Sequence, residues 1–413
     1  MEVMEAMKAK FRVVALNLGV ALFAALVAVG VGELYLRFFR PQPLEAAYMW
    51  EDGTLRHIPS FSFTYARQEF SSLVRFNALG LRGSEIALDP RPGIPRVLFM
   101  GDSFVEGKQV GEEEVVTAAL QRLAAAGGHP IEVINAGVAG YGTGEEILLW
   151  EQVGPALKPE LVILGFYPND VRNNVERKYF ALRDGRIVPN RAPRRPKLRW
   201  IYDLRKLMAS RSHFYVLLKS GMKVMGSNAD EDEPERPAGA EAAPREGGST
   251  GPPATPRPAS LLETEDVFEI QPSPSIREGW LLTEALLTEM KRRVEARGAR
   301  FILAIFPSRY QVDRALWERH AAETGIDPAD HDMDLPGRRL RAWGEREGVA
   351  VVDPLGAFRA GNTDNSFYFS VDAHWRPSGH ELAAEAIAER LMPILRGEEM
   401  GGSDPGENGS GAY

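Results

Sequence analysis

Five short, predominantly apolar runs are the feature that most constrains the fold of this 413-residue chain. They lie at residues 97–100, 131–134, 161–166, 301–306 and 349–352, and stretches of helical period separate most of them. A strand with one solvated face alternates apolar and polar residues, whereas a strand covered on both faces is apolar throughout. The runs therefore predict an α/β domain whose parallel sheet lies between two layers of helices.

Polar clusters follow the first three runs, where each buried strand would pass into a loop. The clusters are Gly101–Ser103, Asn135–Gly140 and Asn169–Asp170, and a fourth cluster, Asp372–His374, comes far downstream. Open α/β sheets place their chemistry at these strand ends. A serine, oxyanion donors and an Asp/His pair are the components of an acyl-transfer site.

The residue types assign a role to each member of this site. The Ser103 hydroxyl needs a neighbouring base to become a nucleophile, and His374 is the natural candidate. Asp372 would hold the imidazole in the required tautomer and stabilise the imidazolium that forms. The backbone N–H groups of Ser103 and Gly140 and the side-chain amide of Asn169 would form the oxyanion hole. Glycine at position 140 allows a loop amide to approach a substrate closely.

The same residues resemble the motifs of a known family, the SGNH or GDSL hydrolases. The matching words are GDS at 101–103, NAGVAG at 135–140, PND at 168–170 and DAHW at 372–375. The resemblance covers about 96–392, apart from an insertion at 190–275. The four residues that name the family are matched by Ser103, Gly140, Asn169 and His374.

This resemblance implies a fold and a range of activities. It implies a flavodoxin-like, three-layer αβα domain with a parallel sheet, no metal and no cofactor. The implied activity is that of an esterase, lipase, thioesterase or O-acetyltransferase. The stretch Asn77–Gly83 is similar to a lead-in seen in membrane-anchored members.

The chain also departs from the family pattern. Phe104 replaces the leucine of GDSL, and Tyr167 stands where the third motif usually has glycine. One residue separates Asp372 from His374, where two are more common. The resulting D-x-H-W form resembles members that acetylate exopolysaccharides, which favours an acetylated cell-surface glycan as substrate.

Structural roles remain open for several polar residues. Asn135 and Asn169 could cap loops, and Asp102 and Asp170 could make only local hydrogen bonds. His380 is the alternative base, although a histidine in a helix more often satisfies local polar groups. Trp375 is interpreted as a packed aromatic rather than a substrate platform.

The N-terminal apolar run predicts a membrane anchor. Val13–Gly32 contains one strongly polar side chain, Asn17, and about 20 such residues span the hydrocarbon core of a bilayer. Three basic residues precede the run and two follow it, which favours a cytoplasmic N-terminus. A cleaved signal peptide and a buried soluble helix are the alternatives; the former would need a better A-x-A-like site than Ala28-Val29-Gly30.

The remaining segments complete the predicted organisation. Residues 1–40 form a cytoplasmic stub and transmembrane anchor, 41–95 a β-rich lead-in, 96–392 the SGNH hydrolase domain and 393–413 a disordered tail. Within the insertion at 190–275, residues 226–260 are acidic, rich in Pro, Gly and Ala and without aromatics, so they are expected to be disordered.

The start of the insertion combines basic residues with apolar residues at helical spacing. Its basic residues are Arg191, Arg194, Arg195, Lys197, Arg199, Arg205 and Lys206. Two interpretations remain open: a cap helix over the sheet, and an amphipathic surface that lies against anionic lipid or an acidic polymer. After the insertion, a helix is expected from Ile276 to Gly298, with a capping box formed by Ser275 and Glu278.

Composition narrows the function classes. A net charge of −8 argues against a nucleic-acid-binding protein. The absence of cysteine excludes disulfides, thiolate catalysis, Cys-based zinc sites and a lipoprotein anchor. The expected function is a membrane-anchored, serine-dependent esterase or deacetylase acting on an acyl ester outside the cytoplasm, in the periplasm or the extracellular space. An O-acyltransferase acting on cell-surface polysaccharide and a non-catalytic envelope binding protein are the alternatives.

Overall fold

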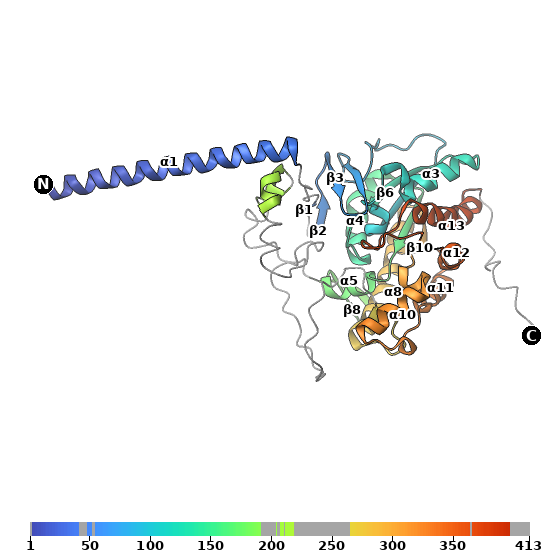
Figure 1. Cartoon of the computed structure of the whole chain (residues 1–413). Helices are drawn as coiled ribbons and strands as arrows, with labels where there is room; N and C mark the ends of the chain where they lie inside the picture. Colours follow the sequence, from blue (N-terminus) through green and yellow to red (C-terminus); the bar gives the residue numbers. More distant parts are fainter. Residues whose placement is uncertain are drawn as a thin grey trace, which may run out of the picture.

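The five apolar runs form one parallel sheet at the centre of the molecule (Figure 1). The computed structural model describes residues 2–40, 48–51, 54–190, 204, 207–209, 211–218, 265–363 and 366–396. The strands are β5 (Arg96–Gly101), β6 (Glu132–Gly137), β7 (Leu161–Phe166), β10 (Arg300–Ile305) and β11 (Ala350–Val352). Their spatial order, β6-β5-β7-β10-β11, is that of a flavodoxin-like sheet, and every pair is parallel. The predicted α/β fold is therefore confirmed.

Helices cover both faces of this sheet. One face carries α4 (Thr143–Leu157), α8 (Pro274–Glu295) and α11 (Leu335–Glu347), and the other carries α3 (Val116–Ala126), α12 (Leu355–Gly361) and α13 (Pro377–Leu395). Strand β5 shows why its sequence does not alternate: Leu98 and Met100 pack into the first core, whereas Val97 and Phe99 pack into the second. All four side chains are fully buried. Burying each contributes about 1.5–3 kcal/mol of hydrophobic stabilisation.

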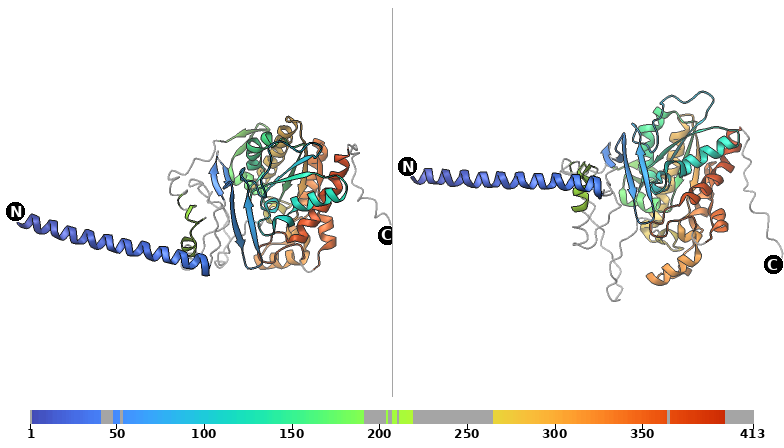
Figure 2. Two further views of the ribbon diagram at one scale, coloured as in Figure 1. Left: turned by 90° about the horizontal axis from the view of Figure 1, so that it is seen from above. Right: turned by 45° about the horizontal axis from the view of Figure 1, so that its top comes forward.

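Two antiparallel hairpins precede the sheet (Figure 2). They pair β1 (Tyr48–Glu51) with β2 (Thr54–His57) and β3 (Phe61–Ala66) with β4 (Ser71–Phe76). The β3–β4 pair alternates: Phe63, Tyr65, Val74 and Phe76 are buried on one face, together with Ser72, and the other face is mostly polar and exposed. A bridge between Arg82 and Asn135 ties this region to edge strand β6. The hairpins therefore lie against the same end of the fold that carries the polar clusters.

Shorter elements connect the main ones. They are α2 (Ser103–Glu106), η1 (Glu112–Glu114), α5 (Asp170–Arg177), β8 (Phe180–Arg183), β9 (Arg186–Pro189), η2 (Glu265–Phe268), α9 (Arg309–Val312), α10 (Arg314–Thr324) and η3 (Pro328–Asp330). Strands β8 and β9 form a third antiparallel hairpin.

Helix α8 begins two residues earlier than the sequence predicts. Its first residue is Pro274, and the Ser273 hydroxyl accepts a hydrogen bond from the Ile276 N–H at 3.3 Å. Proline is well suited to the first helical position because its missing N–H has no partner to lose there. The predicted capping box of Ser275 and Glu278 is therefore wrong. The helix ends at Glu295, shortly before Gly298, whose φ is +80°.

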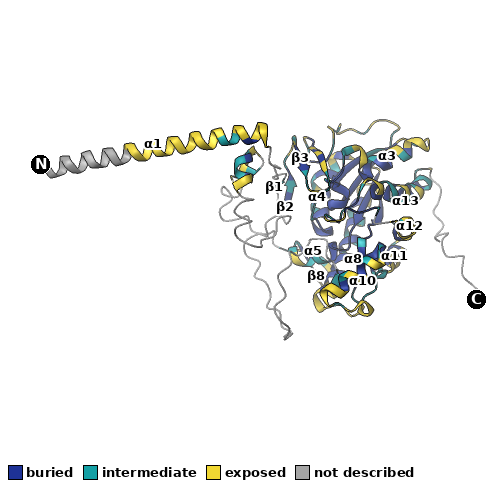
Figure 3. Ribbon diagram, viewed as in Figure 1, coloured by how far each residue is buried: buried dark blue, intermediate teal, exposed yellow. Residues whose placement is uncertain are grey.

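The N-terminal helix α1 (Glu2–Phe39) extends away from the sheet domain (Figure 1). Its stretch Leu16–Phe39 is long and apolar enough to cross a membrane, with a mean hydropathy of 2.0 in the most apolar window. Most of its side chains from Leu16 onward are exposed (Figure 3). This exposure argues against the alternative of a buried soluble helix. The segments expected to be disordered, 226–260 and most of the tail, lie outside the described residues.

Candidate active site

The turn between β5 and α2 positions Ser103. Gly101 has a φ of +154°, and a Cβ at this position would lie 2.5 Å from Val105 Cγ2 and 2.8 Å from the Gly165 carbonyl oxygen. Only glycine fits here, where β5 passes close to α2 and β7. Asp102 accepts a hydrogen bond from the Phe104 N–H at 2.9 Å and caps α2. Ser103 therefore begins α2 at the carboxyl end of β5.

The structure brings Ser103 together with His374 and Asp372. His374 Nε2 lies 2.8 Å from Ser103 Oγ, and His374 Nδ1 lies 2.6 Å from Asp372 Oδ1. Because an ionised carboxylate only accepts hydrogen bonds, Nδ1 carries the imidazole proton and Nε2 accepts from the serine hydroxyl. This arrangement can draw the proton from Ser103 as its oxygen attacks an electrophile.

The pKa values of His374 and Asp372 are shifted in the directions that support this proton transfer. Burial lowers the pKa of His374, but the charge and hydrogen bond of Asp372 outweigh burial and raise it above the ordinary imidazole value. Burial raises the pKa of Asp372, whereas His374 and a hydrogen bond from Gln109 hold it below its usual range. Each partner thus favours the charged form of the other.

A tight loop presents the Asp/His pair, and we refer to residues 369–376 as the Asp–His loop. The N–H of Phe369 donates to the carbonyl of His374 at 2.8 Å, and Ala373 has a left-handed φ of +68°. Glu69, from the connection between β3 and β4, accepts hydrogen bonds from the N–H groups of residues 370–372. The lead-in hairpin therefore holds the loop from outside the sheet.

The three expected oxyanion donors come from three neighbouring strands. Ser103 follows β5, Gly140 follows β6 and Asn169 follows β7, so the strand order places the serine between the other two. Gly140 has a φ of +74°, and Asn169 is buried at the start of α5. The arrangement gathers these groups at one end of the sheet.

Glu106 secures the loop that carries Gly140. Its carboxylate accepts a hydrogen bond from the Ala139 N–H at 2.6 Å and lies 3.1 Å from His57 Nε2. Burial would raise the pKa of Glu106, but Lys108, His57 and the Ala139 N–H lower it to about 2. A buried anion next to position 140 thus fixes a candidate oxyanion donor.

Three further acids lie buried near the serine. Burial is the main cause that raises the pKa of Asp102, to about 6, and those of Glu146 and Asp170 well above their usual range. Each of these pKa values is raised further by neighbouring carboxyls. Asp170 accepts a hydrogen bond from the Tyr167 N–H at 3.3 Å, which shapes the loop before α5. The local hydrogen bonds expected for Asp102 and Asp170 are therefore present.

The other residues singled out by the sequence have structural contacts. His380 accepts a hydrogen bond from the Val116 N–H at 3.3 Å, and burial lowers its pKa to about 3. Asn135 donates to the Val105 carbonyl at 2.7 Å. Trp375 is fully buried, and the Tyr167 ring stacks on Phe104. These contacts match the structural interpretations of His380, Asn135 and Trp375.

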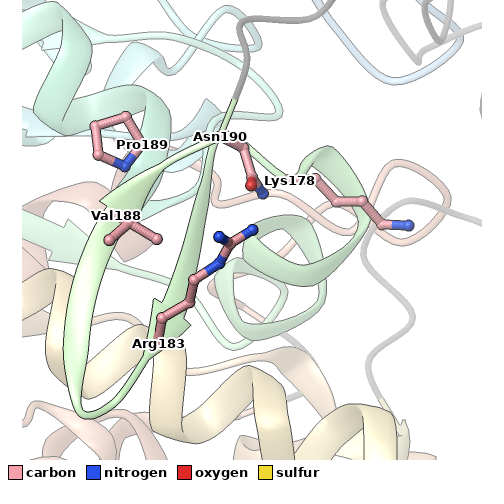
Figure 4. Close-up of a pocket in the computed structure, with 5 residues that line it drawn as sticks. All are labelled: Lys178, Arg183, Val188, Pro189 and Asn190. Atoms are coloured by element: carbon pink, nitrogen blue, oxygen red, sulfur yellow. The ribbon is translucent and has the colours of Figure 1, made fainter.

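A cavity of about 600 Å³ lies apart from these groups, on the β8–β9 hairpin. It is lined by Lys178, Arg183, Val188, Pro189 and Asn190, and Figure 4 shows the Arg183 and Asn190 side chains turned toward each other. None of the lining residues belongs to the Ser–His–Asp group. Among the residues that the structure describes, no group of three His, Cys, Asp or Glu side chains is arranged to hold a metal ion.

Sequence reasoning missed Glu69, Glu106 and His57. Glu106 could have been found, because it lies three residues after Ser103 on the short helix of the GDS motif. Glu69 and His57 carry no local signal, because their partners are distant in the sequence and only the folded lead-in brings them together.

A flavodoxin-like sheet with a hydrogen-bonded Ser–His–Asp group at its carboxyl edge defines a class of α/β proteins equipped for acyl transfer. The family described as "SGNH hydrolase-like domain, acetyltransferase AlgX" matches residues 269–404. That range contains Asp372 and His374. The predicted resemblance to the SGNH/GDSL hydrolases is confirmed over this part of the chain.

Other proteins resemble the chain over different extents. "Probable alginate O-acetylase AlgJ" of Pseudomonas aeruginosa is 28% identical over 132 residues. This match spans 31% of the chain and 30% of AlgJ. Axe2, an acetylxylan esterase from Geobacillus stearothermophilus, is 16% identical, with a TM-score of 0.36 over 72% of this chain and 94% of Axe2. A lipase/acylhydrolase from Enterococcus faecalis is 12% identical, with a TM-score of 0.38 over 73% of this chain and 97% of its own.

Proposed function

We propose that the protein transfers acyl groups through a covalent ester on Ser103. The observation that carries this proposal is the continuous hydrogen-bonded path from Ser103 through His374 to Asp372, at 2.8 and 2.6 Å. In the first step the serine oxygen attacks the carbonyl carbon of an acyl ester, and His374 takes the serine proton. The alcohol then leaves with that proton, and the acyl group stays on Ser103.

The second step transfers the acyl group to an acceptor. A hydroxyl group, from water or from a sugar, loses its proton to His374 and attacks the acyl-enzyme, and Ser103 regains a proton from His374. Throughout, the negative charge on the carbonyl oxygen would be stabilised by the N–H groups of Ser103 and Gly140 and the amide of Asn169. The residues of this site thus serve hydrolysis and transfer equally.

We infer that a polysaccharide is the physiological substrate and that its hydroxyl groups accept the acetyl group from Ser103. The AlgX family and the relative AlgJ support this choice, because their names describe an acetyltransferase and an alginate O-acetylase. The D-x-H-W form of residues 372–375 points to the same class. Ester hydrolysis is the second candidate, supported by the same path between Ser103 and His374.

We also propose that α1 anchors the chain and that residues 41–413 face the periplasm or exterior. The length of the apolar stretch and the basic residues before it support this topology. Reporter fusions at the C-terminus test it. An exported reporter should be active and a cytosolic reporter silent, and the reverse pattern would contradict the topology.

The decisive experiment separates covalent chemistry from the choice of acceptor. The purified full chain is treated with a fluorophosphonate, and with an aryl acetate whose acetyl adduct is sought by intact-protein mass spectrometry. Ser103→Ala is the matched control. Labelling of the wild-type protein alone supports the acyl-enzyme, whereas no labelling of either protein favours a non-catalytic binding protein.

The acceptor is then identified by competition. Turnover of the aryl acetate is followed with and without a deacetylated polysaccharide, including alginate, and acetyl incorporation into the polymer is measured. Incorporation that depends on Ser103 supports a transferase. Free acetate alone, at an unchanged rate, supports the hydrolase.

A further inference from the structure

A short helical segment of the insertion, residues 211–218, lies against the C-terminal end of α1. Figures 1 and 2 show it in light green, running across α1 close to the sheet domain. The Glu33 carboxylate accepts hydrogen bonds from the Ser212 hydroxyl at 2.9 Å, the His213 N–H at 3.1 Å and the Phe214 N–H at 2.9 Å. Glu33 therefore binds the first N–H groups of this segment, which have no partner within their own helix.

The contact is confined to one level of α1. Arg37 donates to the Arg211 carbonyl at 2.9 Å, and a Cβ on Gly32 would lie 3.1 Å from the Phe214 ring. Among the described residues of α1 from Leu16 to Phe39, only Gly32, Glu33 and Leu36 are buried or partly buried. This level comes directly after the apolar run 13–32, where a spanning helix would leave the hydrocarbon core.

The same part of the insertion exposes a set of large apolar side chains. We refer to this set as the insertion patch; its members, with their exposed fractions, are Leu204 (48%), Leu207 (48%), Met208 (38%), Leu217 (44%) and Leu218 (54%). His213 and Val216 are buried instead, so the segment has a covered side and an apolar exposed side. Several large apolar side chains exposed within one short segment indicate a partner surface.

The chemistry around the patch favours lipid as that partner. The sequence from Arg191 to Lys206 contains seven basic residues and one acidic residue, Asp203. Leucines that are close to basic residues in the sequence are typical of segments that lie in the interface of an anionic membrane. If the partner were a second copy of this protein, nothing would require the patch to lie level with the end of the apolar run of α1.

We propose that the insertion patch inserts into the headgroup region of the membrane that α1 spans, on the side that carries the catalytic domain. The partner is an anionic lipid surface, and Glu33 holds the segment at its depth. This inference depends on the proposed anchor and not on the acyl-transfer chemistry. Its consequence is that the sheet domain is held near the membrane by two contacts rather than one.

The absence of cysteine makes this proposal directly testable. Single-cysteine variants Leu207→Cys and Leu217→Cys of the full chain are labelled with a small fluorophore and reconstituted in vesicles that contain anionic lipid. Leu22→Cys, in the middle of the apolar run, reports the anchor. Leu281→Cys, on α8 and 54% exposed, is the matched aqueous control. Quenching is measured with lipids that carry a nitroxide near the headgroup or deep in the acyl chain, and with iodide in water.

The outcomes separate the inference from the anchor. We expect the shallow nitroxide to quench labels at 207 and 217 about as strongly as the deep nitroxide quenches the label at 22, and iodide alone to quench the label at 281. Iodide quenching at 207 and 217, or protection from every quencher as in a protein contact, would overturn the inference. No lipid quenching at Leu22 would overturn the anchor itself.

A second variant tests the role of Glu33. Glu33→Ala should strongly reduce nitroxide quenching at position 217 while leaving that at Leu22 unchanged, because the segment loses the acceptor of its three hydrogen bonds. Tyr35→Ala, an exposed position on α1, is the matched control and should change neither. Equal quenching at 217 in both variants would show that Glu33 does not hold the segment.

Discussion

The carboxylate of Glu69 accepts a hydrogen bond from the backbone N–H of Asp372 at 3.0 Å, although 303 positions separate the two residues. The N–H groups of Ser370 and Val371 donate to the same carboxylate at 2.7 and 2.8 Å. Burial raises the pKa of Glu69, but these three donors outweigh it, so the group stays ionised. Phe70, its neighbour, packs on Phe369 at 5.0 Å between ring centroids. Glu69 is thus placed to act as a positioning residue for the Asp–His loop.

We expect Glu69→Ala to lower kcat by about 10–100-fold with little change in KM, because small misplacements of reacting groups carry costs of this size. Glu69→Asp should recover part of the loss, since a shorter carboxylate still accepts hydrogen bonds. The measurements are kcat, KM and the rate of fluorophosphonate labelling. Glu85→Ala is the matched control, because Glu85 accepts the Ala78 N–H at 3.0 Å away from the loop. Equal kcat in the two alanine variants would rule out a positioning role.

The serine and histidine should act as one unit. Ser103→Ala and His374→Ala are each expected to reduce kcat on the order of 10⁴-fold or more, and the double variant should be little worse than either. Circular dichroism and the melting temperature check that the fold is retained. His380→Gln is the comparison, because His380 contacts Val116 rather than Ser103. Loss of activity in His380→Gln, with retention in His374→Ala, would contradict the assignment of the base.

Asn169→Ala should slow turnover by roughly 10²–10³-fold, the usual effect of removing one oxyanion donor. The loss is expected in kcat rather than KM, because the donor acts on charge that develops only in the transition state. Asn173→Ala is a suitable control: Asn173 lies one turn further along α5 and donates to the Tyr141 carbonyl at 3.3 Å. A loss confined to KM in Asn169→Ala would indicate substrate binding instead.

Glu106→Gln should lower both stability and kcat. Because its pKa lies near 2, the ionised carboxylate contributes stability that is present above its ordinary pKa and is lost as the pH falls toward 2. Removing one member of a buried ionic group costs about 3 kcal/mol or more at neutral pH. Thermal unfolding of the full chain in detergent measures the loss. Glu318→Gln, from an exposed pair with Arg314, should be nearly neutral. Similar melting temperatures for both variants would contradict the buried ionic role.

The sheet could be predicted from sequence because its signal is local and strong. Each of the five strands of the parallel sheet overlaps one apolar run, with bounds that differ by at most three residues, since a strand buried on both faces admits no polar alternation. The start of α8 was harder, because Ser273 and Ser275 are both plausible caps and the proline between them decides the choice.

The site could be predicted only in part, for a physical reason. The chemistry of the site needs a serine, a histidine and an aspartate, so sequence motifs identify Ser103, His374 and Asp372. The groups that hold them do not: Glu69 acts through backbone N–H groups, which any residue presents, and His57 meets Glu106 only once the β1–β2 hairpin has folded against the sheet. Long-range contacts to backbone atoms therefore produce no recognisable motif in the amino-acid sequence.

The pH dependence of turnover provides the sharpest check on the Asp372–His374 pair. His374 works as a base only when it is unprotonated, so kcat/KM should rise with pH and reach half its maximum above the ordinary imidazole pKa of about 6.5. The midpoint lies higher because Asp372 stabilises the imidazolium and outweighs the effect of burial. Asp372→Asn removes that charge, so the midpoint should move to lower pH while the maximal rate falls on the order of 10²–10⁴-fold. The measurement is kcat/KM for an aryl acetate against pH, with Asp353→Asn, in the loop between β11 and α12, as a control that should keep the wild-type midpoint. A midpoint that stays in place or rises in Asp372→Asn would show that this aspartate does not set the protonation of His374.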